Sequence, residues 1–518
     1  MKLRKLVIYD IDYKPLIKGI ELFFPKSEEN YINANCFIGI NGSGKSQTLE
    51  IIAEIFLFLE NVFRKENKKN NLFSPFGFRI EYEITKGNIE YLIIFDCEEI
   101  KTKEKDIQIE IYKKDNEDFS AIDIIGLNIY EFLPSKIIGY SSGANETISL
   151  PFDSYYDEYA EYTYNRAFGK VIGDDYDPNM YFMNYNTNLG IAISSLIFRE
   201  DIPNIDKILS ILQIEDLISF QITIQTFPPD TPNKQQGGVI LTPELEEWKN
   251  ILIKLADKPF YEEKHKKYIL KYNLDDITRT AFKANFANAF ELYTCLYKFE
   301  LLNNLIVDKT TKEKIKKERK QRRLLTKMPM VSDINKVLCY SELKLKLTNE
   351  NKVDYLSLSD GEHQFLNVFG TLLMINQENC LFLLDEPETH FNPKWRRTFI
   401  RTLKDITVGR KQDMIITTHS PFVVSDCKKE NVYIFKKENN IIDIENPQKE
   451  TFGASFDNIL DMAFDIKIPI SEDSLIEINK LNKENDPSII NNKLHDFGES
   501  MEKIKLLSRI ILLNSKKD

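Results

Sequence analysis

The sequence lacks long apolar runs, paired cysteines and the features of an export signal. No stretch of about 18 consecutive apolar residues occurs, so no transmembrane helix is expected. The segment 1–9 is typical of a short strand and lacks the apolar core and small-residue cleavage site of a signal peptide. Six scattered cysteines form no C-x-x-C pair. This argues against a zinc site or a disulfide framework and for a location in a reducing cytoplasm.

A heptad repeat is also missing. The segment 151–334 contains helical patterns, but none keeps a heptad spacing over several turns. We therefore expect a compact, mostly helical lid and not a coiled-coil arm. The tail 445–518 holds two further helical patterns, at 456–463 and 501–513.

Charge is present in quantity but unevenly distributed. At 518 residues the chain is long enough for two or three domains, and its net charge of −11 does not by itself indicate nucleic-acid binding. The run Lys309–Lys327, however, holds ten Lys or Arg and two Glu, a local charge of +8. This run is a candidate for contact with the phosphate backbone of DNA. A solvated helix face is an equal alternative, since no aromatic residues are interleaved to stack on bases.

The clearest motif is Gly39–Ser46, with the sequence GINGSGKS. It fits the G-x-x-x-x-G-K-[ST] phosphate loop and lies between a predicted strand, Cys36–Ile40, and a predicted helix, Gln47–Arg64. Glycines let backbone N–H groups turn toward phosphates, and the helix N-terminus adds favourable partial charge. Lys45 is expected to reach the β- and γ-phosphates and Ser46 to ligate Mg²⁺. The predicted nucleotide-binding residues of this loop are Asn41, Gly42, Gly44, Lys45, Ser46 and Gln47.

The other parts of an ATPase site lie more than 300 residues downstream. The run Leu381–Leu384 has the composition of a buried parallel strand. Asp385 at its end can hold Mg²⁺, and Glu386 can orient or deprotonate the attacking water. The sequence SDGE begins at Ser359, 26 residues before Asp385, and His419 follows 34 residues after it.

This split layout resembles that of the chromosome-maintenance branch of ABC ATPases, the family of Rad50, RecF and the OLD-type ATPases. It is most similar to the ABC-type AAA ATPases found beside restriction and anti-phage defence genes, and the segments Leu133–Gly143 and Phe452–Phe456 add to this similarity. The resemblance implies an α/β fold: an ABC-type P-loop ATPase head with a split site and a large, mostly helical lid insertion. It also implies ATP and Mg²⁺ as cofactors. Two heads of this family enclose two ATP molecules, so a homodimer is implied, possibly within a higher oligomer.

The same resemblance assigns roles to the downstream motifs. SDGE is similar to the ABC signature, in which Ser359 and Gly361 would donate hydrogen bonds to the γ-phosphate held by the opposite subunit. His419 would be the switch histidine that contacts the γ-phosphate. Glu386 and His419 are therefore the predicted catalytic residues, and Ser46 and Asp385 the predicted metal ligands.

The chain departs from the family pattern at three places. Asp360 and Glu362 replace the commoner Gly and Gln of the signature, and the acidic position of the D-loop is Asn392. No glutamine stands where the family carries its Q-loop, and Asn145 and Glu146 are weak substitutes. The departure at Asn392 would change how the two composite sites are coupled.

The motifs predict four regions along the chain. Residues 1–150 would form the N-terminal half of the ATPase head and 151–334 the inserted lid. Residues 335–444 would form the C-terminal half with the signature, the Walker B strand and the switch histidine, and 445–518 a helical tail.

Several functions fit such a head. The first is an ATP-driven sensor, clamp or regulator that acts with DNA and a separate nuclease or other effector in anti-phage defence. An ATPase of DNA repair or recombination and an OLD-like ATPase fused to its own nuclease are the alternatives. The fused nuclease would need a Toprim pattern after the head, and none is recognised there. A transporter subunit is disfavoured because Ser359 follows Lys45 by 314 positions, and a non-hydrolysing scaffold is disfavoured by the intact Lys45, Asp385 and Glu386.

Overall fold

The computed structural model describes most of the chain, in two compact units, Met1–Ala454 and Ser455–Asp518. The described residues are 1–26, 29–64, 72–99, 103, 106–115, 118–143, 147–232, 238–321, 328–438 and 441–515, with the backbone alone at 185–188, 319–321 and 438. Among these residues, no helix is both long and apolar enough to cross a membrane.

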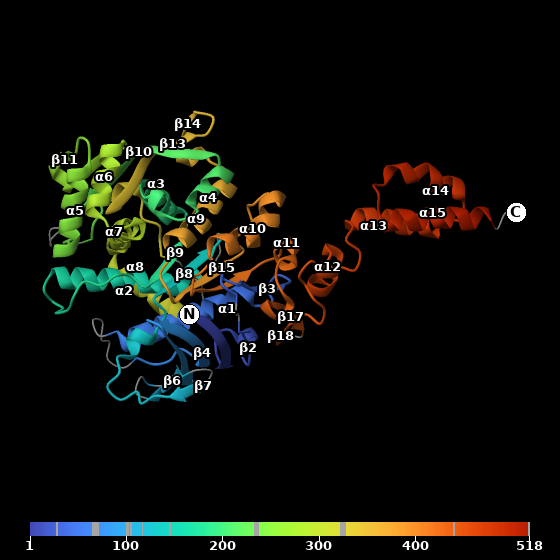
Figure 1. The fold of residues 1–518 in the computed structure, drawn as a ribbon, viewed down its shortest axis with the longest axis horizontal. Coiled ribbons are helices and arrows are strands. Elements are labelled where there is room, and N and C mark those ends of the chain that lie inside the picture. The colour runs from blue at the N-terminus through green and yellow to red at the C-terminus, as the bar shows by residue number, and fades with distance from the viewer. Residues whose placement is uncertain are drawn as a thin grey trace. The chain divides into compact units, whose positions relative to one another are not determined.

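A seven-stranded sheet forms the centre of the first unit (Figure 1). Its order is β18-β17-β3-β16-β15-β8-β9, and every neighbouring pair except β17 and β18 is parallel. Its strands are β3 (Asn35–Gly39), β8 (Lys136–Ser141), β9 (Met180–Met183), β15 (Cys380–Asp385), β16 (Asp413–Thr417), β17 (Val432–Glu438) and β18 (Ile441–Glu445). Strands β3, β15 and β16 are buried along their whole length, as expected of parallel strands covered on both faces.

This pairing brings the two ends of the first unit together. Strand β16 lies between β3, from the N-terminal part of the chain, and β15, so the phosphate loop and the Walker B strand share one sheet. Helix α1 (Lys45–Phe63) follows β3 directly and packs against β3, β15 and β16. The helices of the downstream part are α9 (Asp360–Met374), α10 (Pro393–Ile406) and α11 (Pro421–Ser425). The predicted α/β head with a split site is confirmed.

A six-stranded antiparallel sheet joins the head through α1. Its order is β2-β1-β4-β5-β6-β7. Its strands are β1 (Lys2–Asp10), β2 (Glu21–Phe23), β4 (Gly77–Lys86), β5 (Ile89–Cys97), β6 (Gln108–Asp115) and β7 (Asp118–Ala121). Strand β4 alternates buried and half-buried residues, the pattern of a sheet with one face on the core. Phe56 of α1 meets Tyr82 of β4 edge-on, with ring centroids 5.6 Å apart.

The insert combines helices with its own antiparallel sheet. The helices are α2 (Ser149–Ala167), α3 (Tyr185–Ile197), α4 (Ile205–Ile211), α5 (Pro243–Leu255), α6 (Asp276–Asn285), α7 (Ala289–Leu301) and α8 (Lys309–Gln321). The sheet has the order β11-β12-β10-β13-β14. Its strands are β10 (Ile214–Gln225), β11 (Phe260–Glu262), β12 (Lys267–Asn273), β13 (Leu338–Leu347) and β14 (Lys352–Asp354).

The sheets divide the chain differently from the boundaries expected at 151 and 335. Strand β9 lies inside the expected insert but pairs with β8 of the head sheet. Strands β13 and β14 lie beyond the expected end of the insert, and β13 pairs with β10 along its length. Both differences have the same cause, because strand pairing with a distant segment leaves no local signal in the sequence.

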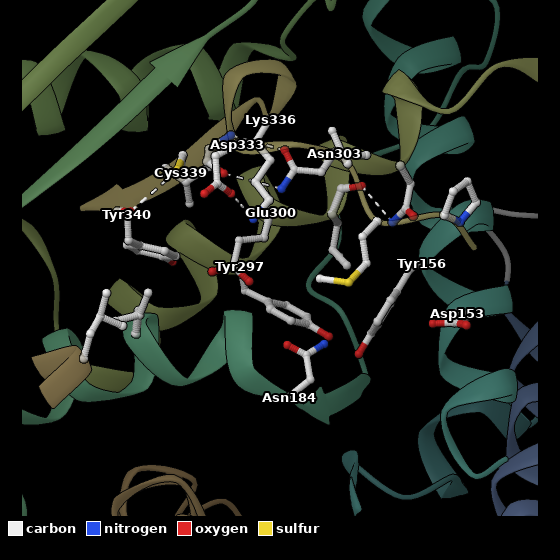
Figure 2. A pocket seen from close by; sticks show the side chains of 18 residues that line it. Asp153, Tyr156, Asn184, Tyr297, Glu300, Asn303, Asp333, Lys336, Cys339 and Tyr340 are labelled. Carbon is white, nitrogen blue, oxygen red and sulfur yellow. Dashed lines mark hydrogen bonds and ion pairs between the residues drawn. The ribbon is translucent and has the colours of Figure 1, made fainter. Parts of the chain in front are cut away.

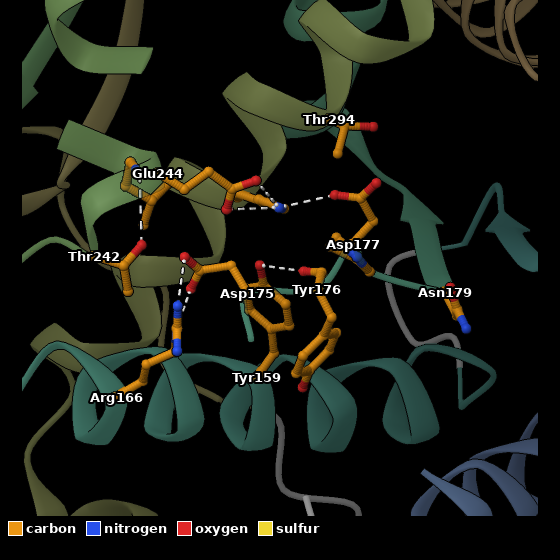
Figure 3. Close-up of polar contacts among 12 residues, drawn as sticks. Tyr159, Arg166, Asp175, Tyr176, Asp177, Asn179, Thr242, Glu244 and Thr294 are labelled. Carbon is orange, nitrogen blue, oxygen red and sulfur yellow. Dashed lines mark hydrogen bonds and ion pairs between the residues drawn. The ribbon is translucent and has the colours of Figure 1, made fainter. Parts of the chain in front are cut away.

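Ion pairs connect helices of the insert to one another and to the segment after α2 (Figure 3). The ammonium group of Lys298 in α7 is almost completely buried and lies 2.9 Å from Glu244 of α5 and 2.8 Å from Asp177. Arg166 at the end of α2 pairs with Asp175, with 2.7 Å between Nε and Oδ1. These contacts connect α5 and α7 with Asp177, and α2 with Asp175.

The second unit is helical throughout its described part. It contains α12 (Phe456–Phe464), α13 (Glu472–Lys483), α14 (Pro487–Lys493) and α15 (Met501–Asn514). The two helices predicted in the tail correspond to α12 and α15. A small core of its own is formed by Ile478, Leu481, Ile490, Leu494 and Leu506.

Candidate nucleotide-binding site

The phosphate loop connects β3 to α1 through glycines whose backbone conformations disfavour residues with side chains. Gly39 and Gly44 have φ values of +140° and +96°, a region that L-residues with side chains rarely adopt. A Cβ atom on Gly39 would lie 2.2 Å from the carbonyl oxygen of Phe435, and one on Gly44 would lie 2.3 Å from Ile442. The loop is therefore held closely against β17 and β18, with α1 beginning at Lys45.

Lys45 is folded back onto its own loop. Its Nζ donates hydrogen bonds to the carbonyl oxygens of Gly39, at 2.8 Å, and Ile40, at 3.1 Å. Burial lowers the pKa of Lys45 to about 8, while Glu386 and Asp385 act in the opposite direction. An anion in the loop would raise this pKa toward its ordinary value, because a further negative charge nearby favours the ammonium form.

Asp385 ends β15 and collects three hydroxyl groups. Ser46 Oγ donates to its Oδ1 at 2.7 Å, Thr417 Oγ1 to the same oxygen at 2.6 Å, and Ser141 Oγ to Oδ2 at 3.3 Å. Burial raises the pKa of Asp385, and the hydrogen bonds from Thr417 and Ser46 oppose that shift. These hydroxyls come from α1, β16 and β8, so the carboxylate lies where four segments meet.

Glu386 projects beside Asp385 from a strained backbone position. Its φ of +50° is left-handed and is uncommon for a residue with a long side chain. Its N–H donates to the carbonyl oxygen of Thr417 at 3.2 Å, which holds this conformation. His419 Nε2 lies 3.4 Å from Glu386 Oε1. The hydrogen bond from His419 lowers the pKa of Glu386, so this carboxyl stays ionised at neutral pH.

These groups line one cavity of about 370 Å³. Its walls are Asn41, Gly42, Ser43, Gly44, Lys45, Ser46, Gln47, Ser141, Ser142, Gly143, Thr147, Asp385, Glu386 and His419. Two buried polar atoms of the loop, Ser43 Oγ and Gln47 Oε1, have no hydrogen-bond partner in the part of the chain that the structure describes. Buried polar groups are normally paired, so these two atoms indicate a polar ligand.

The signature residues lie elsewhere. Ser359 and Gly361 are absent from the walls of this cavity and stand at the start of α9. Ser359 caps the helix: its Oγ accepts from the N–H of Glu362 at 3.4 Å, and its own N–H donates to Glu362 Oε2 at 2.7 Å. A Cβ atom on Gly361 would lie 2.6 Å from the carbonyl oxygen of His390. The start of α9 is thus packed on the loop that follows the Walker B strand.

Some residues of the site were missed in the sequence, and some predictions lie outside the described residues. Ser141, Thr417 and Thr418 carry no motif of their own, and only their position after apolar strands could have indicated them. Asn145 and Glu146, considered for the Q-loop, lie outside the residues that the structure describes.

Two lysines of the basic run form ion pairs inside the insert. Lys312 Nζ lies 2.6 Å and Lys316 Nζ 2.5 Å from the two carboxylate oxygens of Asp157, a fully buried residue of α2. Lys309, Lys314 and Lys317 remain exposed on α8. Residues 322–327, the end of the predicted run, lie outside the described part of the chain.

A second cavity, of about 310 Å³, lies within the insert (Figure 2). Tyr156, Tyr297, Glu300 and Tyr340 are among its walls. Burial raises the pKa of Glu300 to about 8, against a hydrogen bond from Tyr340 and the charge of Lys336. None of the predicted nucleotide-site residues lines it.

Comparison with known families agrees with this geometry. Residues 184–425 match the model of a family described as "AAA domain, putative AbiEii toxin, Type IV TA system". This match covers slightly less than half of the chain, and it shows that this segment is similar to AAA domains of that description. The matched segment includes the signature, Asp385, Glu386 and His419, whereas the phosphate loop precedes it.

Two curated proteins are similar to this chain. The retron Vc95 probable ATPase of Vibrio cholerae serotype O1 biovar El Tor is 24% identical over 501 residues, which cover 93% of this chain and 82% of that protein. Protein ea59 of Escherichia phage lambda is 36% identical over 109 residues, so the match spans only about a fifth of either protein (21% of each).

Solved SMC heads are more distant. The SMC head domain from Thermotoga maritima is 12% identical with a TM-score of 0.31, covering 87% of this chain and 100% of that one. An SMC head from Pyrococcus furiosus, bound to the C-terminal domain of ScpA, is 11% identical with a TM-score of 0.30, covering 86% and 96%.

Proposed function

We propose that this ATPase binds ATP with Mg²⁺ in the 370 Å³ cavity and hydrolyses it. The observation that carries the proposal is the meeting of Lys45 and Ser46 with Asp385, Glu386 and His419 in that one cavity. Lys45 would hold the β- and γ-phosphates. Glu386, ionised and beside His419, would orient the attacking water and accept its proton. His419 would hold the γ-phosphate from the other side.

The residues present fit a magnesium ion. Ser46 Oγ and Asp385 Oδ1 lie 2.7 Å apart, and both are hard oxygen donors of the kind that Mg²⁺ prefers. When bound, the ion would neutralise charge on the phosphates. Ser141 and Thr417 would keep Asp385 oriented toward it through their hydrogen bonds.

The signature supports a homodimer. Ser359 is exposed at the start of α9 and does not line the cavity of its own chain. The phosphate loop of one copy would therefore face the signature of another, and the isologous contact would close two sites. The dimer could assemble further into a higher oligomer.

A role in anti-phage defence with a separately encoded nuclease or other effector is the biological function we propose. The similarity to a retron ATPase over most of both chains supports it. The exposed lysines of the Lys309–Lys327 run would contact DNA, and the protein would act in the cytoplasm. A role in DNA repair or recombination is the alternative for the same head.

The first test measures the ATP turnover and the molecular mass of the variant Glu386→Gln. Glu386→Gln should bind ATP but lower kcat by about 10²- to 10⁴-fold, because the base that activates water is lost. ATP should then hold the variant as a dimer in size-exclusion chromatography with light scattering. Turnover at the wild-type rate would contradict the role proposed for Glu386.

A further inference from the structure

A buried carboxyl next to the nucleotide cavity has no role in the scheme above. Glu388 stands two residues after Glu386, is only 3% exposed and does not line the cavity. One of its oxygens, Oε1, accepts a hydrogen bond from the hydroxyl of Thr418. The other, Oε2, is buried and has no hydrogen-bond partner within the described ranges. Burying a carboxyl is costly, so its single hydrogen bond calls for an explanation.

Thr418 lies directly before His419 and uses its hydroxyl twice. The hydroxyl donates to Glu388 and accepts from the backbone N–H of Ser420 at 2.9 Å. The N–H of Thr418 itself donates to the carbonyl oxygen of Phe37 in β3 at 3.0 Å. The backbone on both sides of His419 is therefore fixed through one hydroxyl group.

The backbone of Glu388 is held in turn by Arg396 of α10 and by the N–H of Phe391. Arg396 donates from Nε to the carbonyl oxygen of Glu388 at 3.2 Å, and from Nη2 to the carbonyl oxygen of Thr389 at 2.5 Å. The N–H of Phe391 also donates to the carbonyl oxygen of Glu388, at 3.0 Å. Glu388 therefore gives Thr418 a fixed partner, and this partner belongs to the same loop as Glu386.

We propose that Glu388 is a positioning residue that, acting through Thr418, sets His419 opposite Glu386. The inference rests on the proposed function, since it presumes that Glu386 and His419 act on ATP. The contact joins the loop after β15 to the segment after β16, the two segments that carry the two side chains only 3.4 Å apart. Small displacements of groups held at such distances have large effects on rate.

The position requires an acceptor oxygen and does not require a negative charge. Burial raises the pKa of Glu388 to about 7, although the hydrogen bond from Thr418 opposes the shift. A glutamine would offer the same carbonyl oxygen to Thr418 without a charge. We therefore expect the conservative amide to preserve the contact.

The test measures kcat and ATP affinity in two pairs of variants. Thr418→Val and Glu388→Ala should each lower kcat by about 10- to 100-fold, with ATP affinity changed less than about threefold, because the contact orients groups and binds no phosphate. Thr418→Ser and Glu388→Gln should stay within about threefold of wild-type kcat. The double variant Thr418→Val with Glu388→Ala should be no worse than the poorer single variant, since both remove one contact.

Thr371→Val is the matched control. Thr371 of α9 is as buried as Thr418, but its hydroxyl has no hydrogen-bond partner in the described part of the molecule. Its kcat should equal that of the wild type. The inference is overturned if Thr418→Val keeps wild-type kcat, if the two losses multiply, or if Thr371→Val loses as much. Wild-type turnover in Glu386→Gln would instead overturn the proposed function, so that variant is measured alongside.

Discussion

The nucleotide cavity and the basic helix α8 are both rich in charged side chains, but their charges have different partners. At the cavity, Lys45, Glu386 and His419 come from three segments of the chain and face one open volume. On α8, Lys312 and Lys316 turn inward to Asp157. A motif with a defined order of strand, loop and helix predicts where its side chains point. A run of like charge predicts composition alone.

Of the changes on and around α8, the removal of Asp157 should have the largest effect, and this effect is on the stability of the fold. Asp157→Ala leaves the buried Lys312 without its partner, and we expect a loss of about 3–5 kcal/mol in the free energy of unfolding. Although burial raises the pKa of Asp157, the contacts with Lys312 and Lys316 lower it overall, so this carboxyl is ionised at neutral pH. Urea denaturation at neutral pH measures the loss.

Glu161→Ala serves as its control. Glu161 lies 3.8 Å from the same Lys316 but is half exposed, so its loss should cost less than about 1 kcal/mol. Equal stability of the two variants would show that the inward lysines of α8 are not structural.

Changing the exposed face of α8 should have a smaller effect, and this effect is on the affinity for DNA. Replacing Lys309, Lys314 and Lys317 by Glu spares the lysines paired with Asp157. If this face contacts phosphates, the slope of log affinity against log salt should fall by about 2–3, roughly 0.9 for each lost contact. ATP affinity should not change. Filter binding at several salt concentrations makes the measurement.

The matched variant carries the same change in charge on the second unit, at Lys480, Lys493 and Lys505, which are all exposed. Its salt slope should remain that of the wild type. If both triple variants behave alike, the run Lys309–Lys327 is not a DNA surface.

The sequence predicted the elements of the cavity because local rules determine them. The glycines, Lys45 and Ser46 belong to one turn, and the apolar run before Asp385 can only be a buried strand. Glu388 and Thr418 could not be paired in this way, since their contact depends on two strand ends meeting in space. The same reason explains β9 and β13, whose partners lie far away in the chain.

The signature is a motif whose sequence predicts local structure but not the nucleotide that it contacts. Its four residues predict a helix start, and Ser359 does cap α9. In the proposed homodimer, the signature would serve the nucleotide bound by the other copy, and this depends on contacts between two chains. The composite site is therefore the claim on which the account depends most.

Mixing two inactive variants tests that claim most directly. Ser359→Arg keeps an intact phosphate loop, and Lys45→Ala keeps an intact signature, so each alone should hydrolyse almost no ATP. Mixed in equal amounts, they should recover roughly a quarter of wild-type turnover, since half the dimers would hold one complete site. Full turnover by Ser359→Arg alone, or no recovery on mixing of two folded variants that form mixed dimers, would contradict the composite site.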